Sequence, residues 1–530
     1  MVPPDLDSLS RADLTALVRH LVDQVADLQQ RAAEFQATVA AQAEEIARLK
    51  KLKGRPRFKP SGMEKAPAAP TGGSRRGLKG SKANRLVITE DRIVSAAVPD
   101  GSRFKGYADF LVQELRLVPR VIRIRRERWQ TPEGRMITAP MPEGVTGHFG
   151  PELRRFILFQ HSRGQVTVER LVAQLTSLGI LISKRQVLRL LNAGEPSFVD
   201  EARAVARAGL ATARWISVDD TGARHQNRNG VCTSLGNDHF TAFATTGSKS
   251  RLNFLELLRA GHPDYEINAA AVAYLRALGL AQQLIAQLVD HSDHHFAEEA
   301  AWLAHLEALG VPTRADWLDP RRLATEGALW GAIQAHGLMP GTVVLSDEAG
   351  QFALSRHALC WVHAERLVHK LETFNDQQHA IQQRLRTLIW RFYADLKTYR
   401  LAPSRQRRTA LGARFDRIFR RRTGFVVLDR LLARLHARKR ELLLVLDRPE
   451  VPLHTNDRER DLRAYVIKRK ISGGTQSDTG RAMRDALLGL MHSCQKLGVS
   501  FWDYLGHRLG IPGPAVPDLA DLVRQRAATA

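Results

Sequence analysis

The sequence has few cysteines and no long apolar run, and each scarcity excludes a class of protein. Cys232, Cys360 and Cys494 lie far apart along the chain, so they build neither a disulfide framework nor a CxxC zinc module. Every apolar run falls short of the ~18 residues that a membrane-spanning helix needs. The opening residues, MVPPDLDSLS, lack the basic and apolar regions of a secretory signal. We therefore expect a cytoplasmic protein without a membrane partner.

Acidic residues are scarce relative to basic ones. The chain has 55 Asp and Glu residues against 79 Lys and Arg residues, a formal net charge of +24. An excess of this size indicates a polyanionic partner, and nucleic acid is the expected one. With 530 residues, of which 44% are hydrophobic, the chain is long enough for several domains with buried cores.

Residues 10–50 are predicted to form a long helix with a heptad seam. Leucine recurs at one heptad position and branched residues recur at the other, a pattern typical of parallel coiled coils. One position of the seam holds Leu14, Leu21, Leu28, Phe35, Gln42 and Leu49, and the other holds Val18, Val25, Ala32, Val39 and Ile46. The pattern predicts a homodimer or higher oligomer; an amphipathic helix packed on its own chain is the alternative.

Residues 51–90 are predicted to be a flexible basic linker, because Pro56 and Pro60 interrupt any helix there. It either contacts DNA phosphates or is a solvated linker. The candidate phosphate contacts are Lys53, Arg55 and Arg57. Residues 91–145 are predicted to be a small β module, since apolar and basic residues partly alternate before a turn at TPEGR. The sequence does not decide whether its Arg face lies on DNA or in water.

Residues 146–200 are predicted to form helices with helix-turn-helix spacing. Gly179 closes the second helix and Ser183 caps the third. A short turn before a basic, polar helix start suits insertion into a DNA groove; plain helical packing is the alternative. The candidate DNA contacts are Lys184, Arg185, Gln186 and Arg189.

Two apolar strands end in acids. Asp219 follows WISV, Asp347 follows TVVLS, and Glu459 stands at the start of a later helix. Ligands of α/β sheets gather beyond the carboxyl ends of strands. Three converging carboxylates suit two Mg²⁺ (or Mn²⁺) ions, which activate water and stabilise the leaving oxygen in phosphodiester cleavage. Acids at strand ends are also common as turn residues, which is the alternative.

The stretches around these acids resemble those of insertion sequence 66 family transposases, and they occur in the family's order. The matching stretches, within about residues 150–510, are SVDDTGAR, TTGSKSRLNFLELL, VVLSDEAGQF, CWVHAERLVHKL and the segment from HTNDRERDLRAYVIKRK to FWDYL. Two departures place the chain in a divergent subgroup. No cysteine precedes Cys232, so the family's zinc module is not expected, and Thr455 stands at the first Asn of an Asn-Asn motif.

The resemblance implies an α+β multidomain protein with an RNase H-like DDE catalytic core at 210–475. Helical insertions at about 255–340 and 365–450 interrupt this core, and a C-terminal helical domain follows at 476–515. The catalytic and metal-binding residues would be Asp219, Asp347 and Glu459. The expected active-site neighbours are Asp220, His363, Asn456 and Arg460.

The implied function is that of a bacterial, nucleoid-associated DNA transposase. It would cut DNA at transposon ends and join the strands to target DNA, with accessory proteins of the element as further candidate partners. One alternative is a catalytically inactive or domesticated dimeric DNA-binding protein derived from a transposase. Another is a metal-dependent nuclease without strand transfer.

Three further groups have candidate roles. In DHSDHH at 290–295, i,i+4 pairs on a helix would share a cation, or the segment is a solvated polar turn. Cys360 is expected to be a packed cysteine rather than a nucleophile, with His363 orienting a phosphate or an acid. An Arg-rich stretch suggests a DNA track or a solvated face; it includes Arg405, Arg407, Arg408, Arg417, Arg420, Arg421 and Arg422.

Overall fold

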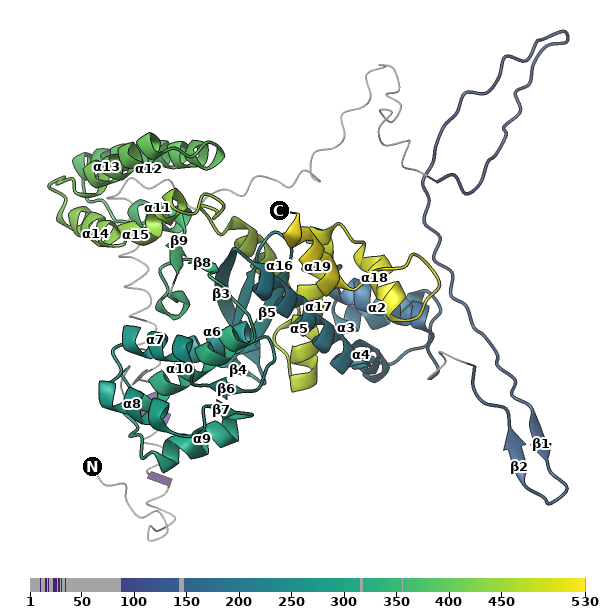
Figure 1. Cartoon of the computed structure of the whole chain (residues 1–530). Coiled ribbons are helices and arrows are strands. Elements are labelled where there is room, and N and C mark those ends of the chain that lie inside the picture. Colours follow the sequence, from purple (N-terminus) through teal and green to yellow (C-terminus); the bar gives the residue numbers. More distant parts are fainter. Residues whose placement is uncertain are drawn as a thin grey trace. The chain divides into compact units, whose positions relative to one another are not determined.

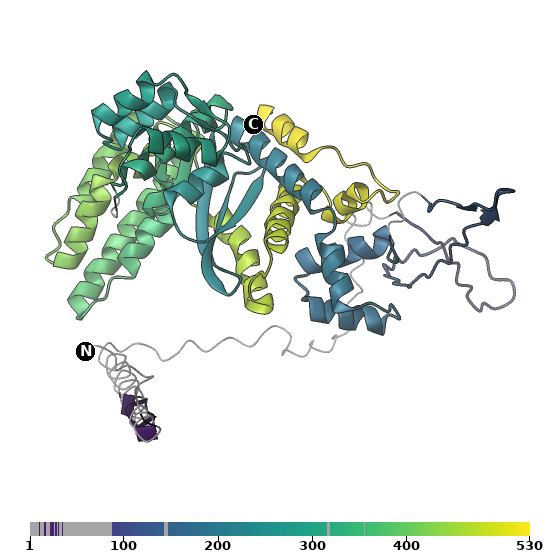
Figure 2. The ribbon, with the colours of Figure 1, turned by 90° about the horizontal axis from the view of Figure 1, so that it is seen from below.

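The computed structural model describes residues 87–142, 147–314, 318–354 and 356–529, together with isolated positions between residues 10 and 34. The chain divides into two units, residues 1–117 and 118–530 (Figures 1 and 2). Lys53, Arg55, Arg57 and most of the predicted coiled coil lie outside the described residues. No helix among the described residues is long and apolar enough to cross a membrane.

The described residues before β1 contain little regular structure. The positions described between residues 15 and 34 are helical and exposed, and residues 87–117 are exposed without helix or strand. Of the alternating segment at 115–129, only Arg128 and Trp129 lie in a strand. A strand needs a hydrogen-bonded neighbour, and pairing begins only with the short hairpin of β1 (Arg128–Gln130) and β2 (Met136–Thr138).

Three helices follow the hairpin: α2 (Pro151–Ser162), α3 (Val168–Ser177) and α4 (Lys184–Asn192). Thr167 caps α3, and Ser183 caps α4 through a reciprocal capping box with Gln186. The chain leaves α3 through Gly179 in the left-handed conformation, at φ +85°. These are the helix boundaries that the turn and cap residues predict.

The centre of the second unit is a five-stranded mixed sheet with strand order β5-β4-β3-β8-β9. β3 pairs antiparallel with β4 and parallel with β8, while β4–β5 is antiparallel and β8–β9 is parallel. The strands are β3 (Trp215–His225), β4 (Arg228–Gly236), β5 (Thr241–Thr246), β8 (Val343–Ser346) and β9 (His357–Leu359). The predicted α+β class is confirmed.

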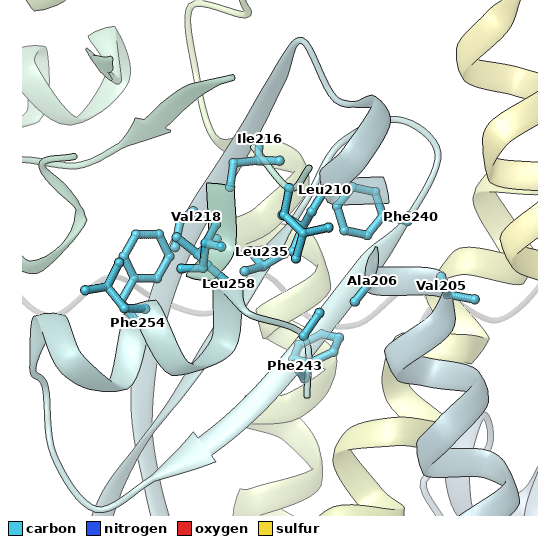
Figure 3. Packing of buried hydrophobic residues seen from close by; sticks show 14 of the residues in the cluster. Val205, Ala206, Leu210, Ile216, Val218, Leu235, Phe240, Phe243, Phe254 and Leu258 are labelled. Atoms are coloured by element: carbon cyan, nitrogen blue, oxygen red, sulfur yellow. The ribbon is translucent and has the colours of Figure 1, made fainter. Parts of the chain in front are cut away.

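Helices from both ends of this unit pack on the sheet and complete its core. α5 (Glu195–Thr212) and α17 (Asp478–Leu497) pack on each other and on β5, while α16 (Asn456–Ser472) packs along β3. In Figure 3, Ile216 and Val218 of β3 lie among the apolar side chains of α5 and α6. α18 (Phe501–Arg508) and α19 (Leu519–Ala528) contribute to the same cluster. The C-terminal helices therefore share one core with the sheet.

A largely helical segment separates β5 from β8. Its elements are α6 (Arg251–Leu258), β6 (Tyr265–Glu266), α7 (Ala269–Ala277), α8 (Gln282–Asp290), β7 (His295–Phe296), α9 (Glu299–Ala308) and α10 (Pro320–Ala335). Most of α10 is buried between α6, α7 and β6. A Cβ atom built on Gly331 would stand 2.0 Å from the backbone oxygen of Glu266. Glycine is therefore required where α10 crosses β6.

A second helical segment follows the 3₁₀ turn η4 (Gly350–Phe352) and β9, and has a core of its own. Trp361 lies at its centre against Phe392 and Phe419, and its indole N–H donates to the backbone oxygen of Leu442. Figure 2 shows its long helices in green. The elements are α11 (Trp361–His369), α12 (Asp376–Leu401), α13 (Arg405–Phe419), α14 (Val426–Ala437), α15 (Lys439–Leu442) and η5 (Leu444–Leu446).

Two glycine substitutions test the packing of α10. Gly331→Ala forces a methyl group against the Glu266 carbonyl, and we expect it to destabilise the chain by about 1–3 kcal/mol, as overpacking does. Gly412→Ala is the matched control, because a Cβ there meets nothing within 4 Å. Higher helix propensity should make that variant about 0.5–1 kcal/mol more stable. Thermal unfolding of both variants measures the difference, and a Gly331→Ala protein as stable as the parent would contradict the packing.

Candidate active site

The β3–β8 register places the first two predicted acids side by side. Ser217 pairs with Leu345 in this parallel ladder. Asp219 and Asp347 each follow two residues later, on the same face as their paired neighbours, because side chains alternate along a strand. The backbone N–H of Asp220 donates to Asp219 at 2.8 Å, and that of Ala349 donates to Asp347 at 3.0 Å. Backbone geometry therefore orients both carboxylates.

Asp219 is in an environment that disfavours its negative charge. Burial raises its pKa to about 6, and the charges of Asp347 and Asp220 push the pKa in the same direction. The hydrogen bond from the Asp220 N–H and the nearby imidazole of His363 oppose this rise. The two acids are therefore close enough to repel each other, and a cation between them would relieve the repulsion.

Buried charges hold the helix that carries the third acid. Arg458 is fully buried, pairs with Asp461 at 2.9 Å and donates to Thr241 of β5 at 3.2 Å. Asp461 also contacts His492 at 3.1 Å and Lys496 at 3.5 Å, both on α17. This network attaches the first turns of α16 to the sheet and to α17, and so sets the place of Glu459.

The carboxylate of Glu459 is engaged by two residues of α11. Its Oε1 lies 3.4 Å from Nε2 of His363 and accepts a hydrogen bond of 3.2 Å from Arg366. His363 also lies near enough to Asp219 to affect its titration. The imidazole of His363 therefore stands between the acid of β3 and the acid of α16.

A pocket of about 390 Å³ lies beside these groups. Its titratable lining residues are Asp347, Glu348, His363, Arg366 and Lys370. Two cationic side chains beside an acidic site suit a ligand that carries negative charge, such as a DNA phosphate.

Cys360, in the same wall, is buried as expected of a packed cysteine. Burial acts to raise the pKa of its thiol, but contact with His363 outweighs it and holds the pKa below its usual value. The hydrogen bond with Cys360 in turn raises the pKa of His363.

The other expected active-site neighbours have different surroundings. Asp220 pairs with Lys249 at 2.5 Å and accepts from Gln351 at 2.9 Å. Asn456 is the first residue of α16. Arg460 is exposed and pairs with Asp457 at 3.4 Å, so it does not contact the three acids.

Sequence reasoning did not identify Arg366 and Lys370. Both lie on the helix that carries His363, at i+3 and i+7, so the 3.6-residue period of a helix places all three on one face. Lys249 and Gln351 were also missed. Their contacts with Asp220 join segments far apart in the chain, and no local pattern predicts such contacts.

The candidate DNA contacts of α4 differ in the exposure and the contacts of their side chains. Arg185 and Arg189 are exposed. Lys184 pairs with Glu169 of α3, and the side chain of Gln186 closes the capping box. Two arginines of the four candidates thus remain on the exposed surface of the helix.

The donor set of the three acids fits hard divalent cations, but the acids do not yet form a closed cluster. Within the described ranges, the one group of three possible metal ligands with all ligand atoms within 4.8 Å of one another is His262, Asp264 and His336. The ligand atoms of Asp219, Asp347 and Glu459 are therefore more widely spread. In the described arrangement, the carboxylate of Glu459 is paired with Arg366 and His363 of α11 instead.

Two comparisons relate this chain to known proteins. The model of the Transposase IS66 family matches residues 343–483, a range that includes Asp347, His363 and Glu459. The uncharacterized protein y4jO of Sinorhizobium fredii is 49% identical over 322 residues, which cover 60% of this chain and 99% of that relative. The chain belongs to the IS66 transposase family.

Proposed function

We propose that this chain is a DDE-type DNA transposase that cleaves DNA at transposon ends and transfers the strands to target DNA. Asp219, Asp347 and Glu459 are the proposed catalytic acids. The observation that carries the proposal is the neighbouring placement of Asp219 and Asp347, in which burial and mutual charge raise the pKa of Asp219 to about 6. The mixed sheet, with Asp219 inside β3 and Asp347 directly after the adjacent parallel strand β8, is in keeping with an RNase H-like core.

The three carboxylates would hold two Mg²⁺ or Mn²⁺ ions. Such a pair supplies an activated water at neutral pH and stabilises the attacking and leaving oxygens of an in-line displacement. The backbone N–H groups of Asp220 and Ala349 fix the rotamers of the two aspartates in advance. The third acid stands on a helix held by the buried Arg458–Asp461 pair, so all three are on supported backbone.

Arg366 and His363 would pair with Glu459 only until its carboxylate turns toward the two aspartates. In the described arrangement they neutralise this acid. When Glu459 turns to the aspartates, Arg366 is released beside the pocket and can donate to a phosphate oxygen. The exchange keeps each charge paired before and after DNA enters the site.

DNA would be held by surfaces outside the catalytic centre. α2, α3 and α4 form the proposed helix-turn-helix, with Arg185 and Arg189 on its exposed surface. The basic residues of 51–90 would add phosphate contacts, and a coiled coil at 10–50 would join two or more copies. With both segments, one assembly would hold two transposon ends together.

Substitution of the catalytic acids tests the proposed chemistry. We expect Asp219→Asn and Glu459→Gln to lower cleavage of a labelled transposon-end duplex by more than ~100-fold, since even supporting residues of metal sites contribute 10–100-fold. Binding of the same duplex, measured by fluorescence anisotropy, should remain. Each variant removes one charged metal ligand and almost no volume.

Asp457→Asn is the control for the Glu459 variant. Asp457 lies on the same turn of α16 but is exposed and pairs with Arg460. It should cleave like the parent. Undiminished cleavage by Glu459→Gln would refute the assignment, while parent protein that binds ends without cutting them would favour a DNA-binding protein without catalysis.

The recognition helix has a separate test. Arg185→Ala and Arg189→Ala should weaken binding to transposon ends, and each should reduce the slope of log affinity against log salt by about 1 if its arginine neutralises one phosphate. Arg276→Ala, an exposed arginine of α7, removes the same charge elsewhere and should leave both quantities unchanged. Equal effects at all three positions would show that only net charge matters.

A further inference from the structure

A cluster of histidines surrounds one carboxylate in the helical segment between β5 and β8. Asp264 lies directly before β6 and is buried. Its two oxygens lie 2.9 Å from Nε2 of His336, the residue that ends α10. The ring of His262 stacks on that of His336 with centroids 3.7 Å apart. One possible ligand atom from each of the three residues lies within 4.8 Å of the others.

A fourth candidate ligand comes from DHSDHH. Of the two alternatives for this segment, the exposed polar turn is the one present: α8 ends at Asp290, His291 is already extended, and the helical i,i+4 pairs do not form. β7 instead starts at His295 and pairs with β6, Glu266 opposite His295. Nε2 of His295 thereby lies 3.5 Å from Oδ2 of Asp264. Sheet pairing brings this histidine to the cluster from about thirty positions along the chain.

The chemical types of the possible ligand atoms determine which metal ion this cluster would bind. Imidazole nitrogens with one carboxylate oxygen suit Zn²⁺ and similar transition metals, whereas Mg²⁺ requires oxygen ligands. Imidazole binds a metal through the lone pair of a ring nitrogen. Rotation of the His262 ring about its Cβ–Cγ bond would aim such a nitrogen at an ion shared with His336.

Ordinary hydrogen bonding accounts for only part of this arrangement. One histidine is enough to satisfy a buried aspartate, and His336 already contacts both oxygens of Asp264. His262 belongs to the same loop as Asp264, and His295 approaches Asp264 from β7. Three imidazoles near one acid are more than a single ion pair needs, and they suit a metal ion.

We propose that His262, Asp264, His336 and His295 bind one transition-metal ion of the zinc type. A closed set of four protein ligands is typical of structural rather than catalytic zinc. The ion would join the loop before β6, the start of β7 and the end of α10. α10 leads directly into β8 and Asp347, so the site would brace the segment that interrupts the sheet.

Metal binding to the full chain tests the proposal. The protein is first stripped with EDTA and then titrated with Zn²⁺ at pH 7, by calorimetry and by thermal unfolding. We expect one tight site per chain and a higher unfolding temperature with Zn²⁺, because a ligand that binds only the folded state stabilises it. Mg²⁺ should not reproduce the effect.

Variants identify the ligands. Asp264→Asn keeps the shape of the side chain and should weaken this site at least tenfold, and His336→Gln should do the same. His295→Gln and His294→Gln are a matched pair from DHSDHH; Nε2 of His294 lies against the backbone oxygen of Val289, so only the first should weaken binding. Circular dichroism without metal checks that each variant folds.

Two results would overturn the proposal. One is Zn²⁺ affinity that is the same in the parent and in Asp264→Asn, which would place the bound ion elsewhere, for instance at Cys360 and His363. The other is the absence of a tight Zn²⁺ site in the parent. Neither result bears on Asp219, Asp347 or Glu459, so failure here is distinct from failure of the proposed transposase chemistry.

Discussion

The parallel pairing of β3 with β8 is the constraint on which the candidate site depends. It places Asp219 next to Asp347 and holds both carboxylates where water is only partly available. Repulsion between the two acids is a cost that the fold has to offset elsewhere, through the large core shared by the sheet, α5 and α17. Repulsion between neighbouring like charges is typical of functional sites, where a bound ligand of opposite charge relieves it.

The residues that hold the helix of Glu459 in place differ from those that pair with its carboxylate. Arg458 and Asp461 fix the place of α16, and removal of Asp461 would leave the fully buried Arg458 without its ion-pair partner. Arg366 and His363 act on the carboxylate of Glu459 itself, and both are partly exposed. The backbone that carries Glu459 is thus held by buried charges, whereas its carboxylate is paired with side chains that solvent reaches.

Local signals in the sequence predicted the parts of the structure that local interactions determine. The cap at Ser183 and the glycine at 179 mark helix ends, and the apolar runs before Asp219 and Asp347 mark β3 and β8. The position of Glu459 at the start of a later helix, together with the family resemblance, singled out this acid. Strand register, which decides whether two acids meet, has no local signal.

Contacts between distant segments were beyond sequence reasoning. The helical alternative for DHSDHH does not hold and the polar turn does, because α8 ends at Asp290 and the β6–β7 pairing determines the backbone at His295. The alternating segment at 115–129 is a strand only at Arg128 and Trp129, since an alternating pattern does not make a strand without a partner. The sequence could have predicted Arg366 as a site residue, because it lies one helical turn from His363. Its ion pair with Glu459 could not be predicted, because it depends on how α11 and α16 pack.

Crystals of the chain grown with Mn²⁺ and a transposon-end duplex offer the most direct test of the central claim, because manganese scatters anomalously and can be located without assumptions about the site. The account predicts anomalous peaks ligated by Asp219 and Asp347, with Glu459 separated from Arg366 and turned toward the same ions. Well-ordered DNA and carboxylates with no manganese between Asp219 and Asp347 would contradict it.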